Sequence, residues 1–248
     1  MPDKEFIFGM HPVLEAIDSG KEMEKVLIQR EMKSQMLPKL RELIRARNIP
    51  FQYVPKEKLN RITRKNHQGI IAFPSPIVYH SLEQLLPTIY EKGEVPFFLL
   101  LDRVTDVGNF GAIVRTAECN GVHTIVVPSR GSALISAQAV KTSAGAIYKL
   151  PVCREDNLKQ TIQYLKDSGL KVIACTEKAE DNCNQADLSG PCAIIMGSKE
   201  TGISDEYLKK ANVLVKIPMF GEIGSLNVSV ATGIILYEVQ RQRGLGEL

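Results

Sequence analysis

Three glycine-containing stretches carry the polar residues whose types and spacing could perform chemistry. They are "RVTDVGNFGAIVRT", "GSKETGIS" and "MFGEIGSLNVSVATG", and each directly follows an apolar run. Each combines glycine with amide, hydroxyl or charged side chains near the expected start of a helix, where free backbone N–H groups bind polar ligand atoms. The pattern therefore predicts a polar-ligand site at three strand ends.

The first stretch holds a single arginine, Arg115, among small residues. On a helix with 100° per residue, the apolar side consists of Phe110, Ile113, Val114, Ala117 and Gly121. Arg115 falls on the other side, where small neighbours would let a ligand or another segment approach, namely Gly108, Gly111, Ala112 and Cys119. A solvated arginine is the simpler explanation of this segment taken alone.

Familiar nucleotide-binding and hydrolase motifs do not fit the chain. "GSKETG" lacks the GK[ST] ending of a phosphate-binding loop, and no GxGxxG follows a strand with an acidic partner about twenty residues later. The G-x-S-x-G motif of a nucleophile elbow is also missing. The sequence thus argues against a P-loop NTPase, a dinucleotide dehydrogenase and an α/β-hydrolase.

The elements that must position these stretches begin near residue 95. Apolar runs such as "PFFLLL", "HTIVVP", "KVIACT", "PCAIIMG" and "VLVKIP" alternate with helical segments such as "DNLKQTIQYLKDSG" and "LNVSVATGIILYEVQRQR". Continuous β-rich runs between helices predict a mainly parallel sheet covered on both faces. Ligands of such sheets bind at the carboxyl ends of the strands, where the three stretches lie.

The first 76 residues alternate short strands and helices and predict a separate small α/β unit. The two prolines of "PSPIVYHS" place the junction there. We therefore expect a first domain over residues 1–76, a linker and leading helix over 77–94, and a second domain over 95–248. The first unit carries a basic cluster: Lys33, Lys39, Arg41, Arg45, Arg47, Lys56, Lys58, Arg61, Arg64, Lys65 and His67. Although acidic residues dilute it, the cluster as a whole favours a phosphate-contacting surface.

Composition sets further bounds. The 248 residues carry 31 Lys+Arg against 28 Asp+Glu, a net charge of +3 that permits a nucleic-acid partner without requiring one. The five cysteines form no CxxC pair and lie in or beside apolar runs, so we expect reduced, mostly buried thiols. The four histidines lack metal-ligand spacing, which predicts no metal. No apolar leader or membrane-length run is present, so we expect a cytoplasmic protein without membrane contact.

The three stretches together resemble motifs one, two and three of the SPOUT superfamily, in its SpoU or TrmH branch of RNA ribose 2'-O-methyltransferases. The motif-bearing segments are "DRVTDVGNFGAIVRTAECNGV", "AIIMGSKETGIS" and "IPMFGEIGSLNVSVATGIILYEVQRQR". "FGMHPVLEAIDSG" and "NHQGIIA" resemble the amino-terminal substrate-binding domain of the 23S rRNA guanosine-2'-O-methyltransferases. The resemblance covers nearly the whole chain in the right order, and three linked motifs are far more specific than one.

The resemblance implies an α/β protein with a small N-terminal α/β RNA-binding domain and a parallel-sheet SPOUT domain whose C-terminal segment forms a trefoil knot. It also implies S-adenosylmethionine as cofactor, RNA (23S rRNA) as substrate, and a homodimer in which the first-motif arginine lies near the partner's site. The implied catalytic or substrate-positioning residues are Arg115, Asn109, Ser225, Asn227 and Glu200. The implied cofactor-binding residues are Gly197, Ile217, Leu226, Thr176 and Met219.

The implied reaction displaces a sulfonium methyl group by a ribose 2'-hydroxyl, which must lose its proton. A guanidinium is a poor proton acceptor near neutral pH, so we expect Arg115 to grip the target phosphate and stabilise the developing alkoxide. A phosphate oxygen or water would then take the proton. Asn109 and Ser225 are also good N-cap residues, and helix capping alone would account for either. Gly233 inside the last helix predicts a close approach by another segment.

The second motif departs from the family pattern. Lys199 stands where most members have glutamate, and Glu200 follows it. A cation there would repel Arg115 if the two were close, or Glu200 could substitute for the missing carboxylate. Two alternatives stay open at this point: an RNA-binding protein made inactive by Lys199, and a methyltransferase that acts on tRNA.

Overall fold

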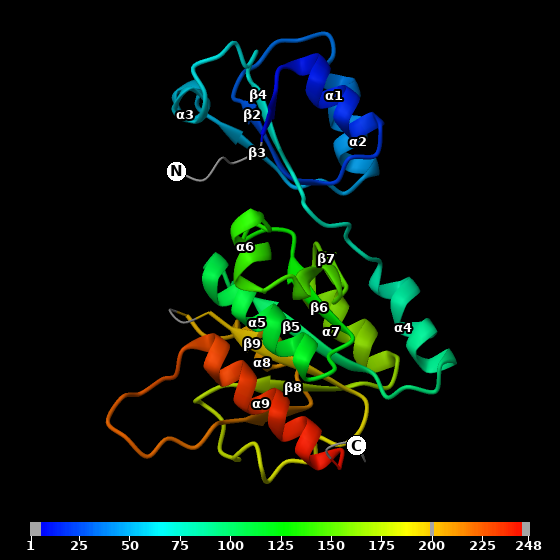
Figure 1. Cartoon of the computed structure of the whole chain (residues 1–248), viewed down its shortest axis with the longest axis vertical. Helices are drawn as coiled ribbons and strands as arrows, with labels where there is room; N and C mark the ends of the chain where they lie inside the picture. Colours follow the sequence, from blue (N-terminus) through cyan, green and yellow to red (C-terminus); the bar gives the residue numbers. More distant parts are fainter. Residues whose placement is uncertain (1–5, 199–200, 245–248) are drawn as a thin grey trace. The chain divides into compact units, whose positions relative to one another are not determined.

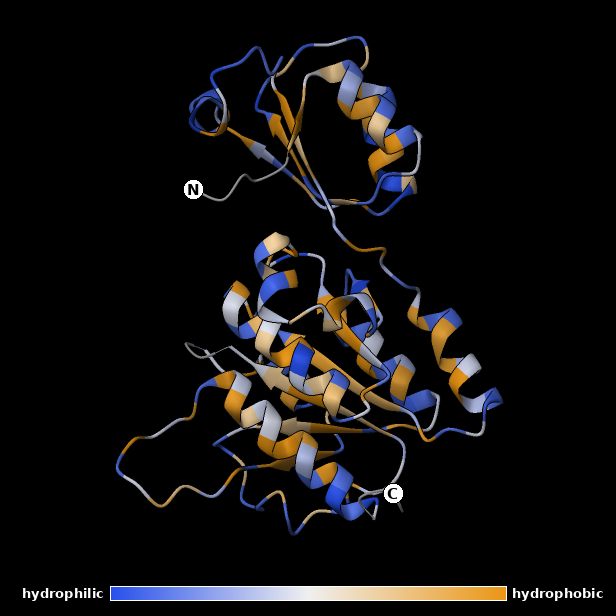
Figure 2. Ribbon diagram, in the orientation of Figure 1, coloured by the Kyte–Doolittle hydropathy of each residue, from blue (hydrophilic) through white to orange (hydrophobic). Residues whose placement is uncertain are grey.

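The chain divides into two compact units, residues 1–78 and 79–248. The computed structural model describes residues 6–198 and 201–244 (Figure 1). Hydrophobic residues concentrate on the strands inside each unit (Figure 2). The helix that precedes the first buried strand of the parallel sheet belongs to the second unit.

The first unit is a four-stranded sheet covered by three helices. Its elements are β1 (Ile7–Phe8), α1 (Met10–Asp18), β2 (Met23–Gln29), α2 (Leu37–Ala46), β3 (Phe51–Val54), α3 (Lys56–Ile62) and β4 (Ile70–Pro74). The strand order is β1-β4-β2-β3, with β2 antiparallel to β4 and parallel to β3. Helices α1 and α2 share one core with β2 and β4. The sequence did not predict α3, which buries only Leu59 and so has almost no apolar periodicity.

One member of the basic cluster is not part of a cationic surface. His67 is buried, its Nδ1 accepts a hydrogen bond from the backbone N–H of Gly69, and its Nε2 lies 2.9 Å from Asn60 Oδ1. Because Nδ1 accepts, Nε2 carries the proton and donates to Asn60. Burial, and then the charge of Lys56, lower the pKa of His67. The sequence-based interpretation of His67 as a phosphate-contacting group was therefore wrong. Its ring is used inside the protein, where it binds Asn60 and the backbone of Gly69.

The second unit contains a six-stranded sheet in which every pair is parallel, as predicted. Its strands are β5 (Phe97–Asp102), β6 (Thr124–Pro128), β7 (Val152–Glu155), β8 (Lys171–Cys175), β9 (Cys192–Gly197) and β10 (Val213–Val215). Its helices are α4 (Leu82–Glu91), α5 (Val107–Cys119), α6 (Ala137–Thr142), the 3-10 turn η1 (Ala146–Tyr148), α7 (Leu158–Asp167), α8 (Asp205–Leu208) and α9 (Val228–Gln242). The strand order β10-β8-β9-β5-β6-β7 brings the carboxyl ends of β8, β9 and β10 together.

Helices cover both faces of this sheet, because alternate strand residues point to opposite sides. One core joins α4 and α7 to residues of five strands, and side chains of α8 pack against it. On the other side α5 packs against α6 and α9 (Figure 1). The start of α9 and the carboxyl end of β10 border the same region as the loops after β8 and β9.

Two findings concern membranes and metals. Within residues 6–198 and 201–244, each helix is too short or too polar to span a bilayer. The same residues contain no group of three or more His, Cys, Asp and Glu side chains placed to hold a metal ion.

Candidate active site

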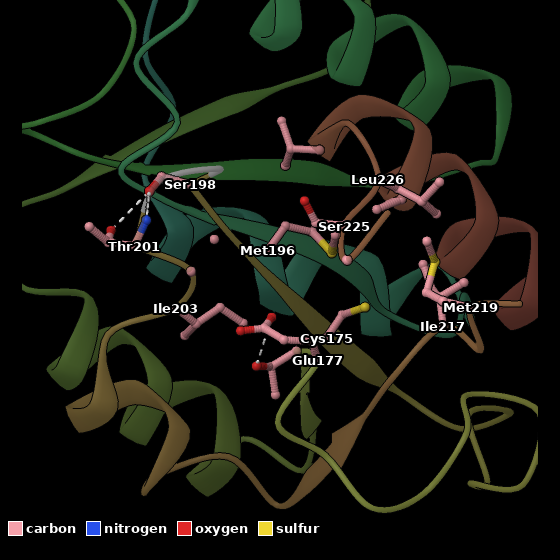
Figure 3. Close-up of a pocket in the computed structure, with 16 residues that line it drawn as sticks. Cys175, Glu177, Met196, Ser198, Thr201, Ile203, Ile217, Met219, Ser225 and Leu226 are labelled. Atoms are coloured by element: carbon pink, nitrogen blue, oxygen red, sulfur yellow. Dashed lines mark hydrogen bonds between the residues drawn. The ribbon is translucent and has the colours of Figure 1, made fainter. Parts of the chain in front are cut away.

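A cavity of about 390 Å³ opens at the carboxyl ends of β8, β9 and β10, next to the start of α9. Figure 3 shows side chains from these four places facing the same space. Its walls include apolar groups, such as Met196 and Ile203, and polar ones, such as Thr176 and Glu177. This size and mixture suit a small organic ligand with an apolar body and several hydrogen-bonding groups.

All five residues predicted to hold a cofactor line this cavity: Thr176, Gly197, Ile217, Met219 and Leu226. They come from three places separated along the chain, after β8, at the end of β9, and between β10 and α9. Ser225 lines the cavity as well. The strand order therefore assembles in space the set that the resemblance had implied.

Gly197 is required by the close approach of the second-motif loop. A Cβ at this position would overlap the backbone atoms of Gly202 and Ile203. The loop turns back on itself through a hydrogen bond of 3.0 Å from the Gly202 N–H to the Ser198 carbonyl. Ser198 Oγ also lies 2.9 Å from Thr201 Oγ1 and accepts from the Thr201 N–H at 3.1 Å (Figure 3). The loop thus forms a compact wall of the cavity.

The first and third motifs meet through two asparagines. Asn227 Nδ2 donates to Asn109 Oδ1 at 3.0 Å, across 118 positions of sequence. Asn227 Oδ1 at the same time accepts from the Ser229 N–H at 2.8 Å. Asn109 thus links the start of α5 to the start of α9 through Asn227.

Neither helix is capped by the residue named from sequence. Asp106 is the N-cap of α5, and its carboxylate accepts from the Asn109 N–H at 2.7 Å. Asn227 is the N-cap of α9, while Ser225 lies two residues earlier at the cavity. A capping side chain must reach an N–H two or three positions ahead, which Asp106 and Asn227 do. The capping explanation of Asn109 and Ser225 was therefore wrong.

Arg115 is exposed on α5, as the helical periodicity predicted. Within residues 6–198 and 201–244 its guanidinium has no hydrogen-bonding or ion-pairing partner, and it is not among the residues that line the cavity. Gly111 is not part of an open wall beside it, because a Cβ there would overlap the Thr142 side chain of α6. Helix packing therefore explains that glycine.

Gly233 faces helix α5 within the chain. A Cβ on Gly233 would lie 3.5 Å from Thr116 Cγ2 on α5, which is ordinary van der Waals contact. Packing between α5 and α9 within the chain therefore does not require glycine. Lys199 and Glu200, the substituted position and its neighbour, lie outside the described residues.

Sequence reasoning missed several cavity residues. Cys175 ends β8, Glu177 follows Thr176, and Met196 precedes Gly197 in β9. The rule that ligands bind at the carboxyl ends of parallel strands would have pointed to "ACTE" as well as to the glycine-containing loops. That stretch lacks glycine and lies outside the three motifs, so only Thr176 within it was predicted.

The thiols differ in chemical character. Cys153, Cys183 and Cys192 are buried, Cys175 is half-buried and Cys119 is exposed. Burial raises the pKa of Cys175 to about 12 and those of Cys153 and Cys192 to about 11. At neutral pH these groups remain thiols. Cys175 can therefore line the cavity without presenting a thiolate, which is the nucleophilic form.

We expect iodoacetamide at about pH 7.5 to alkylate Cys119 in the folded protein and to leave Cys153, Cys175 and Cys192 largely unmodified, since only thiolates react. Mass spectrometry of tryptic peptides measures the labelled fractions. Denatured protein, in which all five cysteines should react, is the control. Labelling of Cys175 at the rate of Cys119 in the folded protein would contradict its raised pKa.

The comparisons with known proteins agree on one family. Residues 96–237 match the model of the SpoU rRNA Methylase family, and residues 6–79 match that of the RNA 2'-O ribose methyltransferase substrate-binding domain. YacO of Bacillus subtilis, named for the TrmH family of tRNA/rRNA methyltransferases, is 34% identical over 239 residues, 96% of each chain. A Staphylococcus aureus protein named for the same family is 39% identical over 245 residues, 98% of each chain.

A solved structure extends the similarity to three dimensions. The AdoMet-bound rRNA methyltransferase from Sinorhizobium meliloti is 26% identical, with a TM-score of 0.61 over 95% of this chain and 86% of that one. Fold and sequence therefore point in the same direction, and the predicted resemblance is confirmed.

Proposed function

Because the chain belongs to the SpoU/TrmH family of RNA 2'-O-methyltransferases, we propose that it transfers a methyl group from S-adenosylmethionine to a guanosine ribose of 23S rRNA. The observation that carries this proposal is the cavity at the ends of β8, β9 and β10, which gathers residues of the second and third motifs. The match of residues 6–79 to a substrate-binding domain of RNA methyltransferases supports an RNA substrate. The proposal includes that the protein methylates RNA in the cytoplasm.

The cavity fits the proposed methyl donor. Ile217 and Leu226 offer apolar surface for an adenine ring, and Thr176, Glu177 and Ser198 offer hydroxyl and carboxylate groups for ribose and amino-acid atoms. The backbone of the tight turn after Gly197 lies against the same space. S-adenosylmethionine, when bound, supplies a methyl group on a positively charged sulfur. The protonated thiol of Cys175 does not compete with the RNA for that methyl group.

The residues of this chain position the 2'-hydroxyl and handle its charge. During attack, a bond forms between the ribose oxygen and the methyl carbon while the carbon–sulfur bond breaks, with its electron pair staying on sulfur. In the proposal, Arg115 holds the adjacent phosphate by paired hydrogen bonds and stabilises the developing alkoxide. The proton leaves to a phosphate oxygen or water. Asn227, fixed by its bond to Asn109, would orient the ribose beside Ser225.

The exposed guanidinium of Arg115 would serve the cavity of a second subunit in a homodimer. An apolar stripe on α9 supports this arrangement, because Val230, Ile234 and Tyr237 recur at helical spacing and are 51%, 38% and 56% exposed. Such stripes mark protein interfaces. Helix α5, which carries Arg115, packs directly against α9. Close approach of the partner would also account for Gly233 between these residues.

The proposed trefoil knot is supported by the way the C-terminal helix is fastened. Gln242 on α9 accepts from the Leu188 N–H at 2.8 Å and donates to the Ala186 carbonyl at 3.0 Å. Arg243 donates to the carbonyls of Gly190 and Pro96 at 2.8 and 3.1 Å. Gln242 and Arg243 are thus held by the segment between β8 and β9 and by Pro96 before β5, as a threaded C-terminal segment would be.

A methyl-transfer assay tests the function. Purified protein, tritiated S-adenosylmethionine and total RNA from a strain that lacks the corresponding gene should yield labelled RNA, with Arg115→Ala as the negative control. Incorporation into 23S rRNA, followed by mapping of the 2'-O-methylated nucleotide, would support the proposal in full. Label confined to tRNA would replace the substrate, and RNA binding without label above the control would support the inactive alternative raised by Lys199.

A further inference from the structure

A buried carboxylate of the first motif holds the loop of the second. Asp102 ends β5, its side chain is 3% exposed, and it lies opposite Gly197 in the register between β5 and β9. Its Oδ2 accepts from the backbone N–H and from the Oγ of Ser204, both at 2.7 Å. Ser204 stands at the N-cap of α8, yet its hydroxyl donates to Asp102 rather than capping the helix. Asp102 thus anchors the far end of the loop that starts at Gly197.

Arg103 completes this attachment from a strained backbone position. Its Nε donates to Asp102 Oδ1 at 2.9 Å, and its Nη2 donates to Asp102 Oδ2 at 3.1 Å. The same Nη2 lies 3.4 Å from the Gly202 carbonyl oxygen. Arg103 has a φ of 56°, in the left-handed region that a residue with a Cβ rarely adopts. Such strain persists where the surrounding contacts impose it, often at functional sites.

The attached loop residues are cavity walls, whereas Asp102 and Arg103 are not. Thr201, Gly202 and Ile203 all line the cavity. Asp102 lies behind them, inside the protein, and reaches them through Ser204 and Arg103. A change in the carboxylate would therefore alter the cavity indirectly, through the backbone of residues 201–204.

We infer that Asp102 and Arg103 are positioning residues that hold the second-motif loop in its ligand-binding geometry. This inference rests on the proposed function only for the identity of the ligand. The carboxylate is suited to the task because one charged group accepts all four hydrogen bonds at once, and bonds to a charged group are stronger than neutral ones. An asparagine at position 102 would have one oxygen and one N–H₂ group. The N–H₂ group cannot accept hydrogen bonds, so some of the bonds from Arg103 or Ser204 must be lost.

The test compares Asp102→Asn and Ser204→Ala with the wild type. Isothermal titration with S-adenosylhomocysteine should show dissociation constants raised about 10-fold or more for Asp102→Asn and a few-fold for Ser204→Ala, as expected for losing bonds to a charged group. Hydrogen exchange of the free protein should show faster exchange at residues 201–204 in Asp102→Asn. Arg103→Lys, which keeps the positive charge but loses the paired N–H geometry, should fall between the wild type and Asp102→Asn.

Loss of general stability must be separated from loss of positioning. The control shortens the buried side chain of Leu86 on α4, either to Ala or to Val. Of these two variants, we use the one whose melting temperature matches that of Asp102→Asn. It should bind the ligand as the wild type does. Equal affinities for Asp102→Asn and this control, with unchanged exchange at residues 201–204, would overturn the inference. A wild type that binds no S-adenosylhomocysteine would instead overturn the proposed function, and the exchange measurement would still decide the role of Asp102.

Discussion

Arg115→Ala is expected to lower the rate of methyl transfer by about 10²–10³-fold, the usual effect of removing one donor that stabilises a developing oxyanion. Arg115 is exposed and has no partner within residues 6–198 and 201–244. Its removal therefore breaks no ion pair there, and the fold should be unaffected. Single-turnover assays with saturating RNA and donor measure the chemical step.

The lysine variant distinguishes between charge and geometry. Arg115→Lys keeps the positive charge but cannot make paired hydrogen bonds to a phosphate, so we expect a rate between those of wild type and Arg115→Ala. An Arg115→Lys enzyme with near-normal turnover and unchanged pH dependence would show that the paired contact is not needed. Circular dichroism and cofactor affinity, both expected to match the wild type, control for folding.

Mixing two inactive variants tests whether Arg115 serves the partner's cavity. In random dimers of Arg115→Ala and a cavity variant, the mixed dimers would have one intact site, so roughly a quarter of wild-type activity should return. If Arg115 acted within its own subunit, each mixed dimer would carry one defective residue in each site and no activity would return. The mixture is thus informative whichever arrangement holds.

Gly197→Ala is expected to be the most damaging small substitution in the second unit. The added methyl group would overlap backbone atoms of Gly202 and Ile203, which cannot rotate away as a side chain would. We expect a loss of stability of about 1–3 kcal/mol from overpacking. Displacement of the loop should also weaken the binding of S-adenosylhomocysteine, because Gly197, Gly202 and Ile203 line the cavity.

Gly190→Ala is the matched control for this substitution. A Cβ on Gly190 would meet no atom within 4 Å, and the residue lies between β8 and β9, away from the residues that line the cavity. Urea unfolding and ligand titration should leave this variant close to the wild type. Wild-type affinity in Gly197→Ala would contradict the tight packing of the loop.

Much of the fold and of the candidate site could be predicted because it depends on local pattern. Continuous apolar runs between amphipathic helices indicated the parallel sheet, and the three polar strand ends indicated the ligand site. The five proposed cofactor residues line the cavity, although their roles stay predictions until ligand binding is measured. Helix periodicity also placed Arg115 on an exposed face.

Contacts between distant segments could not be predicted in this way. Several residues that could cap α5 or α9 lie within a few positions of one another, and only the backbone path decides that Asp106 and Asn227 do so. Likewise His67 belongs to a basic cluster in the sequence, whereas in the structure it is buried and its pKa is lowered. These differences come from burial and backbone direction, which side-chain type alone does not specify.

The sequence by itself determined where a polar-ligand site could form, since glycine, amide and charged groups after apolar runs fit such a site at strand ends. The tertiary structure decided how they cooperate. The order β10-β8-β9-β5 places the end of β5 beside the loop after β9, so Asp102 reaches Ser204 across 102 positions of sequence. Asn109 meets Asn227 for the same reason. Such contacts depend on how parallel strands are ordered in the sheet, which local periodicity does not encode.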